Sequence, residues 1–537
     1  MEKILKILEE NARISLEDIA TMVESTPEEV AKQIDAYQQA HVINGYKALI
    51  DWDKAGADRV QAIIELRVSP KRDCGFDEVA ANIARFDEVD SVMLMSGGYD
   101  LSLVMSGKSF QDIALFVAKR LSPLDDVLST ATHFVLRPGT HRRTGAAVMD
   151  YAKIISAAAR DMRPSGIRKF FDIAAEMKDC ISLGVGEPDF KTPWTVRDAG
   201  IRSLEKGRTW YTSNSGLAEL REETCNYLSR RMGLSYTPGE TVVTVGGSEA
   251  IDMCIRALVN PGDEVIIPEP CFVCYYPITT LTGGVPVPLP LKAENGFKLT
   301  AQELEAAITP RTKLIIFPFP CNPTGAVMRR EDLEPIAALL RDKDIIVLSD
   351  EIYAELTYGG ERHVSIASLP GMKERTVVVN GFSKAYAMTG WRLGYACGPE
   401  PIIKVMTKIH QSAIMCAPTT SQYAAVTALR RCDADIEAMR SEYDMRRRFL
   451  VSSLNRMGLD CFEPEGAFYA FPSIRKTGLS SEEFCEKLLF GKKVAVVPGN
   501  AFGDSGEGHV RISYSYSIGH LSEALHRIEL FLQELGV

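Results

Sequence analysis

Between about residue 148 and residue 537, short β-branched runs alternate with segments that have helical spacing of apolar residues. Thr241–Val245, Ile345–Leu348 and Val377–Val379 are three such runs, and each leads into a polar loop. Alternating strands and helices are typical of α/β proteins, in which helices cover a mostly parallel sheet. A chain of 537 residues is also too long for one hydrophobic core, so we expect further domains before this unit.

Two cations follow the run Val377–Val379. Lys384 stands just after the predicted strand, and Arg392 comes eight residues later. A lysine in a partly dry pocket can lose its proton and form a Schiff base, and an arginine at that distance can clamp a phosphate. Taken alone, the pair has a plainer interpretation as a solvated surface.

Three other loops carry polar groups near strand ends. Gly246-Gly-Ser-Glu-Ala250 follows a strand and opens a helix, where free N–H groups and the helix dipole favour an anion. Asp350 ends an apolar strand, where a carboxylate can keep a pyridinium nitrogen protonated. Asn322 lies in a turn bounded by prolines and can point into the same cleft. Singly, a plain βα turn, a helix cap and a structural turn explain these segments.

The same stretch contains the phrases SLGVGEPDF, RTWYTSNSGLAELRE, NPTGAV, SDEIYAEL, SKAYAMTGWRLGYACGP, PEGAFYAF, VAVVPGNAFG and GHVRISYS. In this order they resemble the class I/II aminotransferases of fold type I over almost all of residues 148–537. The resemblance implies a pyridoxal 5′-phosphate (PLP) enzyme with a mostly parallel central sheet. It further implies a large domain over about residues 196–460, and a small α/β domain made by the N-terminal arm and about residues 461–537.

The resemblance also implies a role for each matching residue. Lys384 is expected to bond the cofactor and shuttle the proton, and Asp350 to pair with the ring nitrogen. Arg511 is expected to take the substrate α-carboxylate. The other expected contacts are Tyr353 and Asn322 at the phenolic oxygen, Phe272 on the ring face, Gly247, Ser248, Glu249, Ser383 and Arg392 at the phosphate, Tyr211 at the phosphate of the neighbouring subunit, and Gly186 and Asn322 in the substrate pocket.

These roles predict ping-pong transfer of an amino group between an L-amino acid and a 2-oxo acid. Carbon–sulfur β-elimination on the same cofactor is an alternative. Aromatic, branched, alanine-like and acylated diaminopimelate-type donors are all compatible with the sequence. Ser248 stands where some aspartate-using relatives have Lys, and Gly381 where several have a phosphate-binding Ser. The resemblance therefore implies no dedicated dicarboxylate site, and the phosphate site is expected to rely on Ser383 and Tyr211.

The twelve cysteines are scattered along the chain and are interpreted as thiols. Cys271 and Cys274 form a lone CxxC with no second Cys/His pair at ligand spacing, so no metal site is predicted. With Cys321 they flank expected cofactor contacts, and packing is the preferred reason for their presence.

The first 55 residues are predicted to form a winged helix-turn-helix. Ser15 can cap the second helix, and Thr26, Pro27 and Glu29 are a strong start signal for the third. Residues 41–46 are expected to turn into the strand of the wing.

Residues 59–137 follow the order βαββαβ, which is the ferredoxin-like arrangement. With the segment before them they resemble the leucine-responsive (Lrp/AsnC) regulators through NARISLEDIA, VINGYKALID, MSGGYDLSLV and ATHFVL. In that family the second module oligomerises and binds amino acids, often near a Gly–Asp turn that Gly98 and Asp100 match. We assign residues 56–138 to this domain and residues 139–147 to a linker.

The charge of the front segment disfavours DNA binding. Residues 1–50 hold five Lys/Arg against nine Asp/Glu, and residues 1–147 hold 17 against 23. A DNA-binding face normally neutralises several phosphates with Lys or Arg. We therefore prefer a module that senses an amino acid or organises a homodimer or larger homo-oligomer. The alternative is a DNA-binding regulator that only senses the cofactor.

No apolar run approaches the roughly 20 residues of a membrane helix, and the N-terminus lacks the apolar block of a signal peptide. We expect a cytoplasmic protein without a membrane partner. Its expected partners are a small-molecule amino acid and a 2-oxo acid.

Overall fold

The computed structural model describes residues 2–23, 25–46, 60–69, 76–95, 98–135, 151–162, 174, 177–360 and 362–537. Contacts divide the chain into two compact units, Met1–Tyr151 and Ala152–Val537. None of the described helices is long and apolar enough to cross a membrane.

The front unit begins with α1 (Glu2–Glu10), α2 (Leu16–Val23) and α3 (Pro27–Gln39). The Thr26 hydroxyl accepts the Glu29 N–H at 3.3 Å, as the start signal predicts. Residues 41–46 form a turn and an irregular segment, so the expected strand is absent there. The reason is local: the N–H groups of Val42 and Ile43 both turn back to the carbonyl of Tyr37 and are not free for a ladder. The rest of the expected winged helix-turn-helix, residues 47–55, lies outside the described residues.

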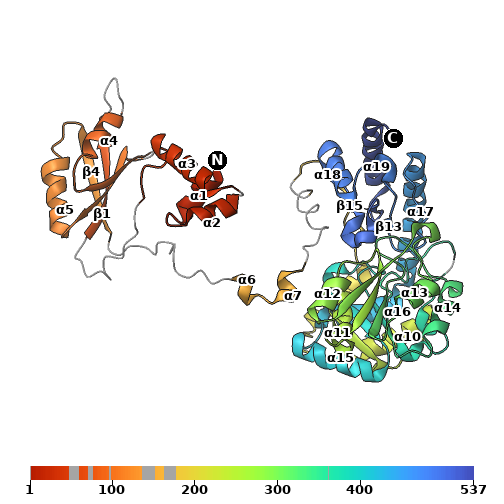
Figure 1. Ribbon diagram of the computed structural model, residues 1–537. Coiled ribbons are helices and arrows are strands. Elements are labelled where there is room, and N and C mark those ends of the chain that lie inside the picture. Colours follow the sequence, from red (N-terminus) through yellow and green to blue (C-terminus); the bar gives the residue numbers. More distant parts are fainter. Residues whose placement is uncertain are drawn as a thin grey trace. The chain divides into compact units, whose positions relative to one another are not determined.

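The second part of the front unit has the predicted βαββαβ order (Figure 1). Its four-stranded sheet has the order β2-β3-β1-β4, with antiparallel neighbours. In β1, Ala62, Ile64, Leu66 and Val68 are buried in one core while alternate residues face away, because successive strand side chains point to opposite faces. The elements are β1 (Val60–Val68), α4 (Asp77–Ile83), β2 (Val89–Leu94), β3 (Leu101–Gly107), α5 (Phe110–Phe116), the π-helix Val117–Leu121 and β4 (Val127–Val135).

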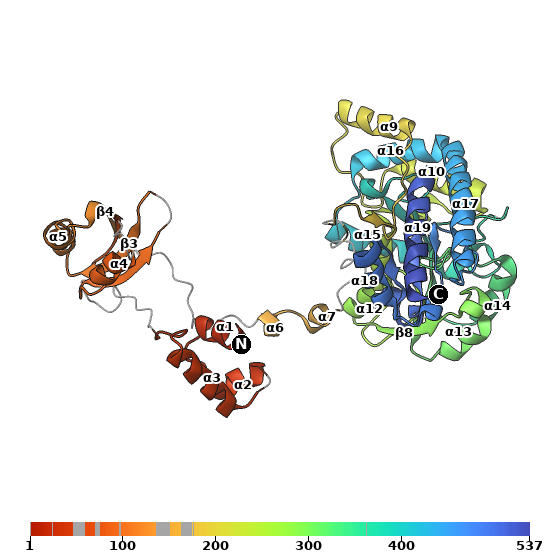
Figure 2. The same ribbon diagram turned by 90° about the horizontal axis from the view of Figure 1, so that it is seen from above.

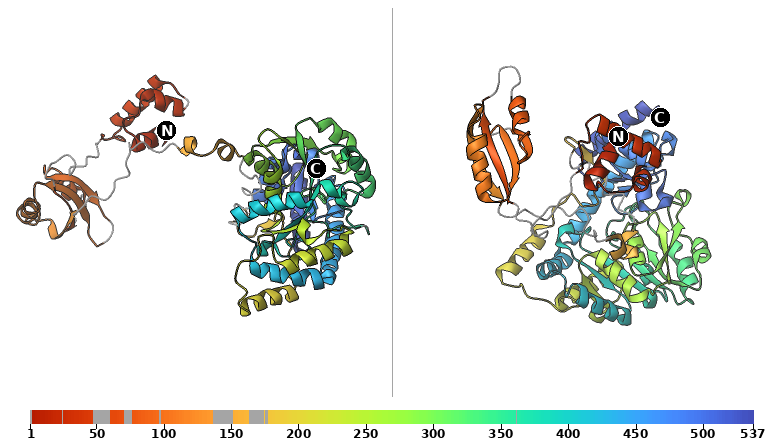
Figure 3. Two further views of the ribbon diagram at one scale, coloured as in Figure 1. Left: turned by 90° about the horizontal axis from the view of Figure 1, so that it is seen from below. Right: turned by 60° about the vertical axis from the view of Figure 1, so that its left-hand side comes forward.

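The second unit is a larger α/β structure, and Figures 2 and 3 show its helices around the central sheet. Its elements up to the end of the sheet are α6 (Tyr151–Ile154), α7 (Ala157–Arg160), β5 (Ile181–Ser182), α9 (Trp194–Glu205), α10 (Ala218–Met232), β6 (Thr241–Thr244), α11 (Gly247–Leu258), β7 (Glu264–Glu269), α12 (Tyr275–Leu281), β8 (Val285–Pro290), α13 (Ala301–Ala307), β9 (Thr312–Phe317), α14 (Arg330–Leu340), β10 (Ile346–Asp350), β11 (Thr376–Gly381) and β12 (Gly394–Cys397).

The seven-stranded sheet has the order β6-β12-β11-β10-β9-β7-β8. Neighbouring strands from β11 to β8 pair in parallel, whereas β12 is antiparallel to both β11 and β6. Val377 and Val379 lie in one core cluster and Val378 in another, so both faces of the sheet are covered. This double burial explains why the strands read as continuous β-branched runs in the sequence.

The C-terminal part forms a smaller layer with its own core. A three-stranded sheet of order β13-β16-β15 lies beside the two-stranded pair β14-β5, which ties this part to the N-terminal arm. Its elements are α17 (Asp433–Arg456), β13 (Tyr469–Ala470), α18 (Ser481–Lys492), β14 (Val494–Ala495), β15 (Val497–Pro498), β16 (Val510–Ser513) and α19 (Ile518–Leu535). The two helices before them, α15 (Glu400–Ala413) and α16 (Thr419–Arg431), pack instead in the large part, α15 on α11 and α16 on α9 and α10.

Candidate active site

The site is built where β10 and β11 end side by side. These strands are parallel neighbours, and Asp350 at the end of β10 pairs in register with Val379 of β11. Lys384 follows three residues after β11 ends at Gly381. Because the carboxyl ends of parallel strands meet at one edge of a sheet, two segments far apart in sequence deliver an acid and an amine to the same place.

Lys384 is held in a partly buried position. Its Nζ donates to the carbonyl of Gly186 at 2.5 Å and lies 5.7 and 5.6 Å from the ring centroids of Tyr353 and Phe468. Burial lowers the pKa of the Lys384 ammonium to about 8, the exposed carboxylate of Glu187 opposes this, and Arg511 lowers the pKa further. About a tenth of the amine is therefore unprotonated at pH 7, against less than about a thousandth for an exposed lysine.

Asp350 is buried, and its carboxylate has two donors. The Tyr275 hydroxyl donates to Oδ2 at 2.7 Å, and the Ile352 N–H donates to Oδ1 at 3.3 Å. Burial raises the pKa of the Asp350 carboxyl, while both donors act to lower it. Sequence reasoning missed Tyr275, because it belongs to none of the matched phrases and its hydroxyl reaches Asp350 only through the fold.

The glycine turn between β6 and α11 forms a second part of the site. Gly246 has φ 82°, and a Cβ there would lie 2.6 Å from Arg392 Nη2, so the guanidinium packs directly on the turn. The N-terminal N–H groups of α11, which belong to Gly247, Ser248 and Glu249, have no partner in the preceding turn of the helix. A cation and a helix N-terminus thus meet at one anion-binding point.

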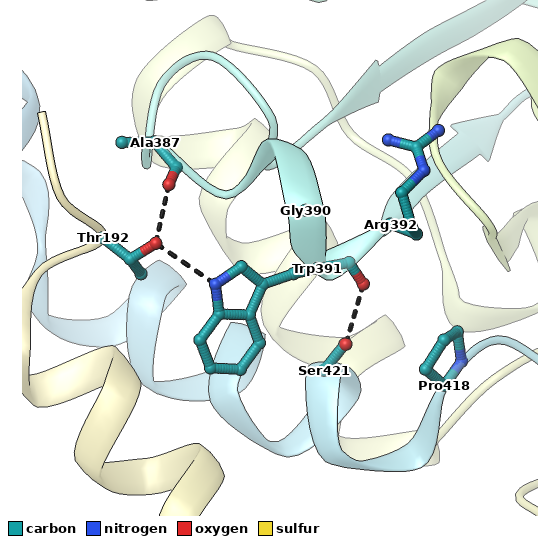
Figure 4. A pocket seen from close by; sticks show the side chains of 7 residues that line it. All are labelled: Thr192, Ala387, Gly390, Trp391, Arg392, Pro418 and Ser421. Atoms are coloured by element: carbon teal, nitrogen blue, oxygen red, sulfur yellow. Dashed lines mark hydrogen bonds between the residues drawn. The ribbon is translucent and has the colours of Figure 1, made fainter. Parts of the chain in front are cut away.

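The Arg392 segment is fixed by Thr192, in the loop before α9, and by Ser421 of α16 (Figure 4). The Trp391 indole donates to the Thr192 hydroxyl at 3.2 Å, and the Ser421 hydroxyl donates to the Trp391 carbonyl at 2.8 Å. Arg392 itself has φ 50° and donates through Nη1 to the Thr389 carbonyl at 3.0 Å. A pocket of about 450 Å³ opens beside these residues.

Glu249 lies on the same turn, but its carboxylate is already engaged. Oε2 accepts the Val245 N–H at 2.5 Å, and Oε1 lies 2.8 Å from His410 Nδ1. Only the backbone N–H of Glu249 is therefore available to an anion.

Arg511 lies on β16 and is 4% exposed. Its guanidinium donates to Asn322 Oδ1 at 2.8 Å and to the Gly184 carbonyl at 2.6 Å, and its Nε has no hydrogen-bond partner among the described residues. No carboxylate of the described chain pairs with it, and burial lowers the pKa of the Arg511 guanidinium. Because an unpaired buried charge is costly, this guanidinium is suited to a carboxylate ligand.

Tyr353 and Tyr469 close the site on the side of the small layer. Their hydroxyls lie 2.8 Å apart, and the Arg511 guanidinium lies 4.4 Å from the Tyr469 ring centroid. A Cβ on Gly186 would lie 2.5 Å from the Tyr469 hydroxyl, so only glycine fits there as the structure stands. Tyr469 was not singled out from the sequence, although it lies within PEGAFYAF.

The other sequence-predicted residues are placed as follows. Ser383 is buried next to Lys384, and Phe272 is partly buried, with its ring 6.0 Å from that of Tyr275. Tyr211 is 75% exposed, and Trp210 beside it is 60% exposed. The Tyr211 side chain is therefore largely open to solvent.

Near the site, Cys271 and Cys321 are buried thiols and Cys274 is a partly buried one. Burial raises the pKa of Cys321 to about 11 and also raises those of Cys271 and Cys274. Thiols with raised pKa values are poor nucleophiles, which agrees with a packing role. Among the described residues, no group of three or more His, Cys, Asp or Glu side chains could hold a metal ion.

The family comparison agrees with this geometry. Residues 178–528 match aminotransferase class I and II, and residues 61–144 match the Lrp/AsnC ligand binding domain. The fold and site define an aminotransferase with a regulator-like front module. The chain belongs to the class I and II aminotransferase family.

Individual relatives cover the second unit. An aspartate aminotransferase of Pyrococcus abyssi is 49% identical over 70% of this chain and 97% of its own length. The aromatic-amino-acid aminotransferase 2 of Thermococcus litoralis is 46% identical over 70% of this chain and 97% of its own. The structure of the aspartate aminotransferase from Thermus thermophilus with maleate is 40% identical and covers 70% of this chain and 99% of its own, with a TM-score of 0.67.

Proposed function

We propose that this aminotransferase uses PLP, held in the site described above, to exchange an amino group between an L-amino acid and a 2-oxo acid. The class I and II family is known to use this cofactor. The observation that carries the proposal is the convergence of four groups from separate segments: the Lys384 amine, the Asp350 carboxylate, the α11 turn with Arg392, and the Arg511 guanidinium, which has no carboxylate partner within the described part of the chain.

The residues present fit the cofactor. Gly246 leaves room for Arg392 against the N-terminus of α11, so this point suits a phosphate. Asp350 at the opposite end suits a protonated ring nitrogen, with Tyr353 and Asn322 near the phenolic oxygen and Phe272 against the ring. When bound, PLP supplies an aldehyde that bonds amino groups and a ring that accepts electrons.

The chain itself supplies binding, orientation and proton transfer. Lys384, with its lowered pKa, acts as the nucleophilic amine and then as the base that moves the substrate Cα proton. Arg511 takes the α-carboxylate, and Gly186 leaves room beside it. The two half-reactions follow as a ping-pong cycle: amino acid in and oxo acid out, then the reverse with a second oxo acid.

The substrate class stays broad. Names of similar proteins include both aspartate and aromatic aminotransferases. Ser248 at the start of α11 is exposed and neutral, and it offers no charge for a distal carboxylate. We therefore propose general L-amino acid donors without dedicated dicarboxylate recognition.

The exposed Tyr211 supports a homodimer. Tyr211 and Trp210 present large aromatic surface to solvent, as does Trp194 with 61% exposure. Exposed aromatic groups of this size are typical of interfaces. We propose that Tyr211 reaches the phosphate of the partner subunit in a cytoplasmic homodimer or larger homo-oligomer.

We propose that the front unit senses an amino acid or organises the oligomer. Asp100 Oδ2 accepts the Val68 N–H at 2.9 Å and Arg67 donates to the Gly98 carbonyl at 2.7 Å, which gives the Gly98–Asp100 turn a fixed shape. The acidic balance of residues 1–147 makes DNA a poor partner. Tight, salt-dependent binding to its own promoter would favour the regulator alternative instead.

The decisive experiment is Lys384→Ala. We expect loss of turnover and of the absorbance band that the cofactor gives when bonded to the enzyme lysine, while the fold persists by circular dichroism. Near-normal activity in that variant would refute the assignment. Pyruvate release from cystathionine without an added oxo acid would instead identify the β-elimination alternative.

A further inference from the structure

The turn that forms the anion-binding point is held by two side chains, the partly buried Glu249 and the fully buried His410. Glu249 is the third residue of α11, and its side chain folds back over the start of the helix. Its Oε2 accepts the N–H of Val245, the residue just before Gly246. The Thr244 hydroxyl donates to the Gly246 carbonyl at 2.9 Å, so the turn is fixed on both sides of Val245.

The second oxygen of Glu249 is held by a residue from a distant helix. His410 lies on α15, is fully buried, and has Nδ1 2.8 Å from Glu249 Oε1. Its Nε2 has no hydrogen-bond partner among the described residues. The ring therefore makes a single polar contact, which is to Glu249.

The contacts of Glu249 have an electrostatic consequence at the anion-binding point. A carboxylate at the start of a helix is favoured by the helix dipole, but one facing a bound phosphate would repel it. Because the two Glu249 carboxylate oxygens contact the Val245 N–H and His410 Nδ1, the negative charge is directed away from the ligand. The backbone N–H groups of α11 and the Arg392 guanidinium remain for the anion.

We propose that Glu249 and His410 act as positioning residues for the cofactor phosphate, through Glu249 acceptance of the Val245 N–H. Neither side chain is a ligand of the cofactor. The inference rests on the proposed function, since it concerns the same phosphate site.

The test measures PLP affinity of the full-length protein, freed of cofactor and then titrated with PLP by fluorescence quenching. Glu249→Ala removes a hydrogen bond to a charged group, and we expect the dissociation constant to rise about ten- to a hundred-fold. His410→Leu, which keeps volume but lacks the donor, should raise it by about three-fold or more. The double variant should be no weaker than Glu249→Ala, because the two residues act through one contact.

Conservative variants separate positioning from simple stability. Glu249→Gln keeps an acceptor for Val245, and His410→Asn keeps a donor near Nδ1, so both should stay within about three-fold of the parent. The matched control is Glu303→Ala. Glu303 is the third residue of α13 and accepts the Thr300 N–H at 3.3 Å, but α13 packs on β8, at the opposite sheet edge from β6. Glu303→Ala should lower the melting temperature without changing PLP affinity.

The phosphorus-31 resonance of bound PLP gives a second readout, which should shift in Glu249→Ala and stay unchanged in Glu303→Ala. A rise of less than about ten-fold in the dissociation constant of Glu249→Ala, or additive effects of the Glu249 and His410 variants, would overturn the inference. Failure of the parent protein to bind PLP would overturn the proposed function itself, which distinguishes the two.

Discussion

Gly186 gives the sharpest test of the packing around the reacting amine. A Cβ at this position would lie 2.5 Å from the Tyr469 hydroxyl, and such atoms do not approach within 3.0 Å, so the two groups must separate by at least about 0.5 Å in Gly186→Ala. The Gly186 carbonyl accepts from Lys384, and the Tyr469 hydroxyl is bonded to that of Tyr353. Any shift that relieves the clash displaces one of these contacts.

Misplacement of about 1 Å near the reacting atoms costs about 100-fold in rate, so we expect kcat/KM of Gly186→Ala to fall about ten- to a hundred-fold. Tyr469→Phe removes the hydroxyl and leaves the ring carbon Cζ 3.6 Å from the new Cβ, which is ordinary contact. Tyr469→Phe alone loses one hydrogen bond, worth about 1 kcal/mol, or about five-fold in rate.

The double variant Gly186→Ala/Tyr469→Phe should therefore be close to Tyr469→Phe alone, so that the interaction energy equals the whole cost of Gly186→Ala, about 1.4–2.7 kcal/mol. The assay is initial-rate transamination coupled to a dehydrogenase that consumes the released oxo acid, with melting temperatures of all four proteins as the folding control. If the two effects multiply, the clash is not the cause of the loss and the reasoning fails.

Three further predictions follow from the same site. The rate at which the cofactor-free protein captures PLP should increase with pH and level off above about 8, because Lys384 is a cation below its lowered pKa and a free amine above it. Free lysine, measured alongside, is the control. If the rate for the protein still increases at pH 10, as it does for free lysine, the buried position of Lys384 is contradicted. Tyr275→Phe should lower kcat about five- to ten-fold and shift the acidic limb of the kcat–pH profile to higher pH, because loss of the Tyr275 hydroxyl raises the pKa of Asp350 further. An unchanged pH profile would exclude a role for Tyr275 at Asp350. Mixing Tyr211→Ala and Lys384→Ala subunits should restore up to about a quarter of the parent activity if Tyr211 acts across the dimer, whereas no recovery would place it elsewhere.

The strands that are buried on both faces could be predicted from the sequence, because a continuous β-branched run such as Val377–Val379 is compatible with few other structures. The βαββαβ order of the front unit could also be predicted from the sequence and is confirmed. Two-residue strands such as Val494–Ala495 and Tyr469–Ala470 carry no periodic signal and could not be predicted. The turn at residues 41–46 was misread because its apolar residues suit a strand, whereas their N–H groups return to α3.

The sequence motifs around Lys384 and Asp350 predict which strand ends these residues follow, and their functional roles stay predictions. The directions of the side chains could not be predicted from the sequence. The Glu249 carboxylate turns back to Val245 and His410, and the Tyr275 hydroxyl meets an acid 75 residues away. Contacts of this kind depend on how helices pack across the sheet, which one sequence does not encode in any local pattern.

The guanidinium of Arg511 has a practical consequence for anyone who handles the protein. This buried positive group pairs with no acid among the residues that the structure describes, so we expect it to attract small carboxylates of suitable shape. Acetate, citrate or maleate in a buffer would then occupy the place of the amino donor, raise the melting temperature and inflate the apparent KM. Kinetic constants measured in such buffers would include competition between the substrate and the buffer carboxylate. A carboxylate-free medium is needed to measure the affinity for the substrate alone.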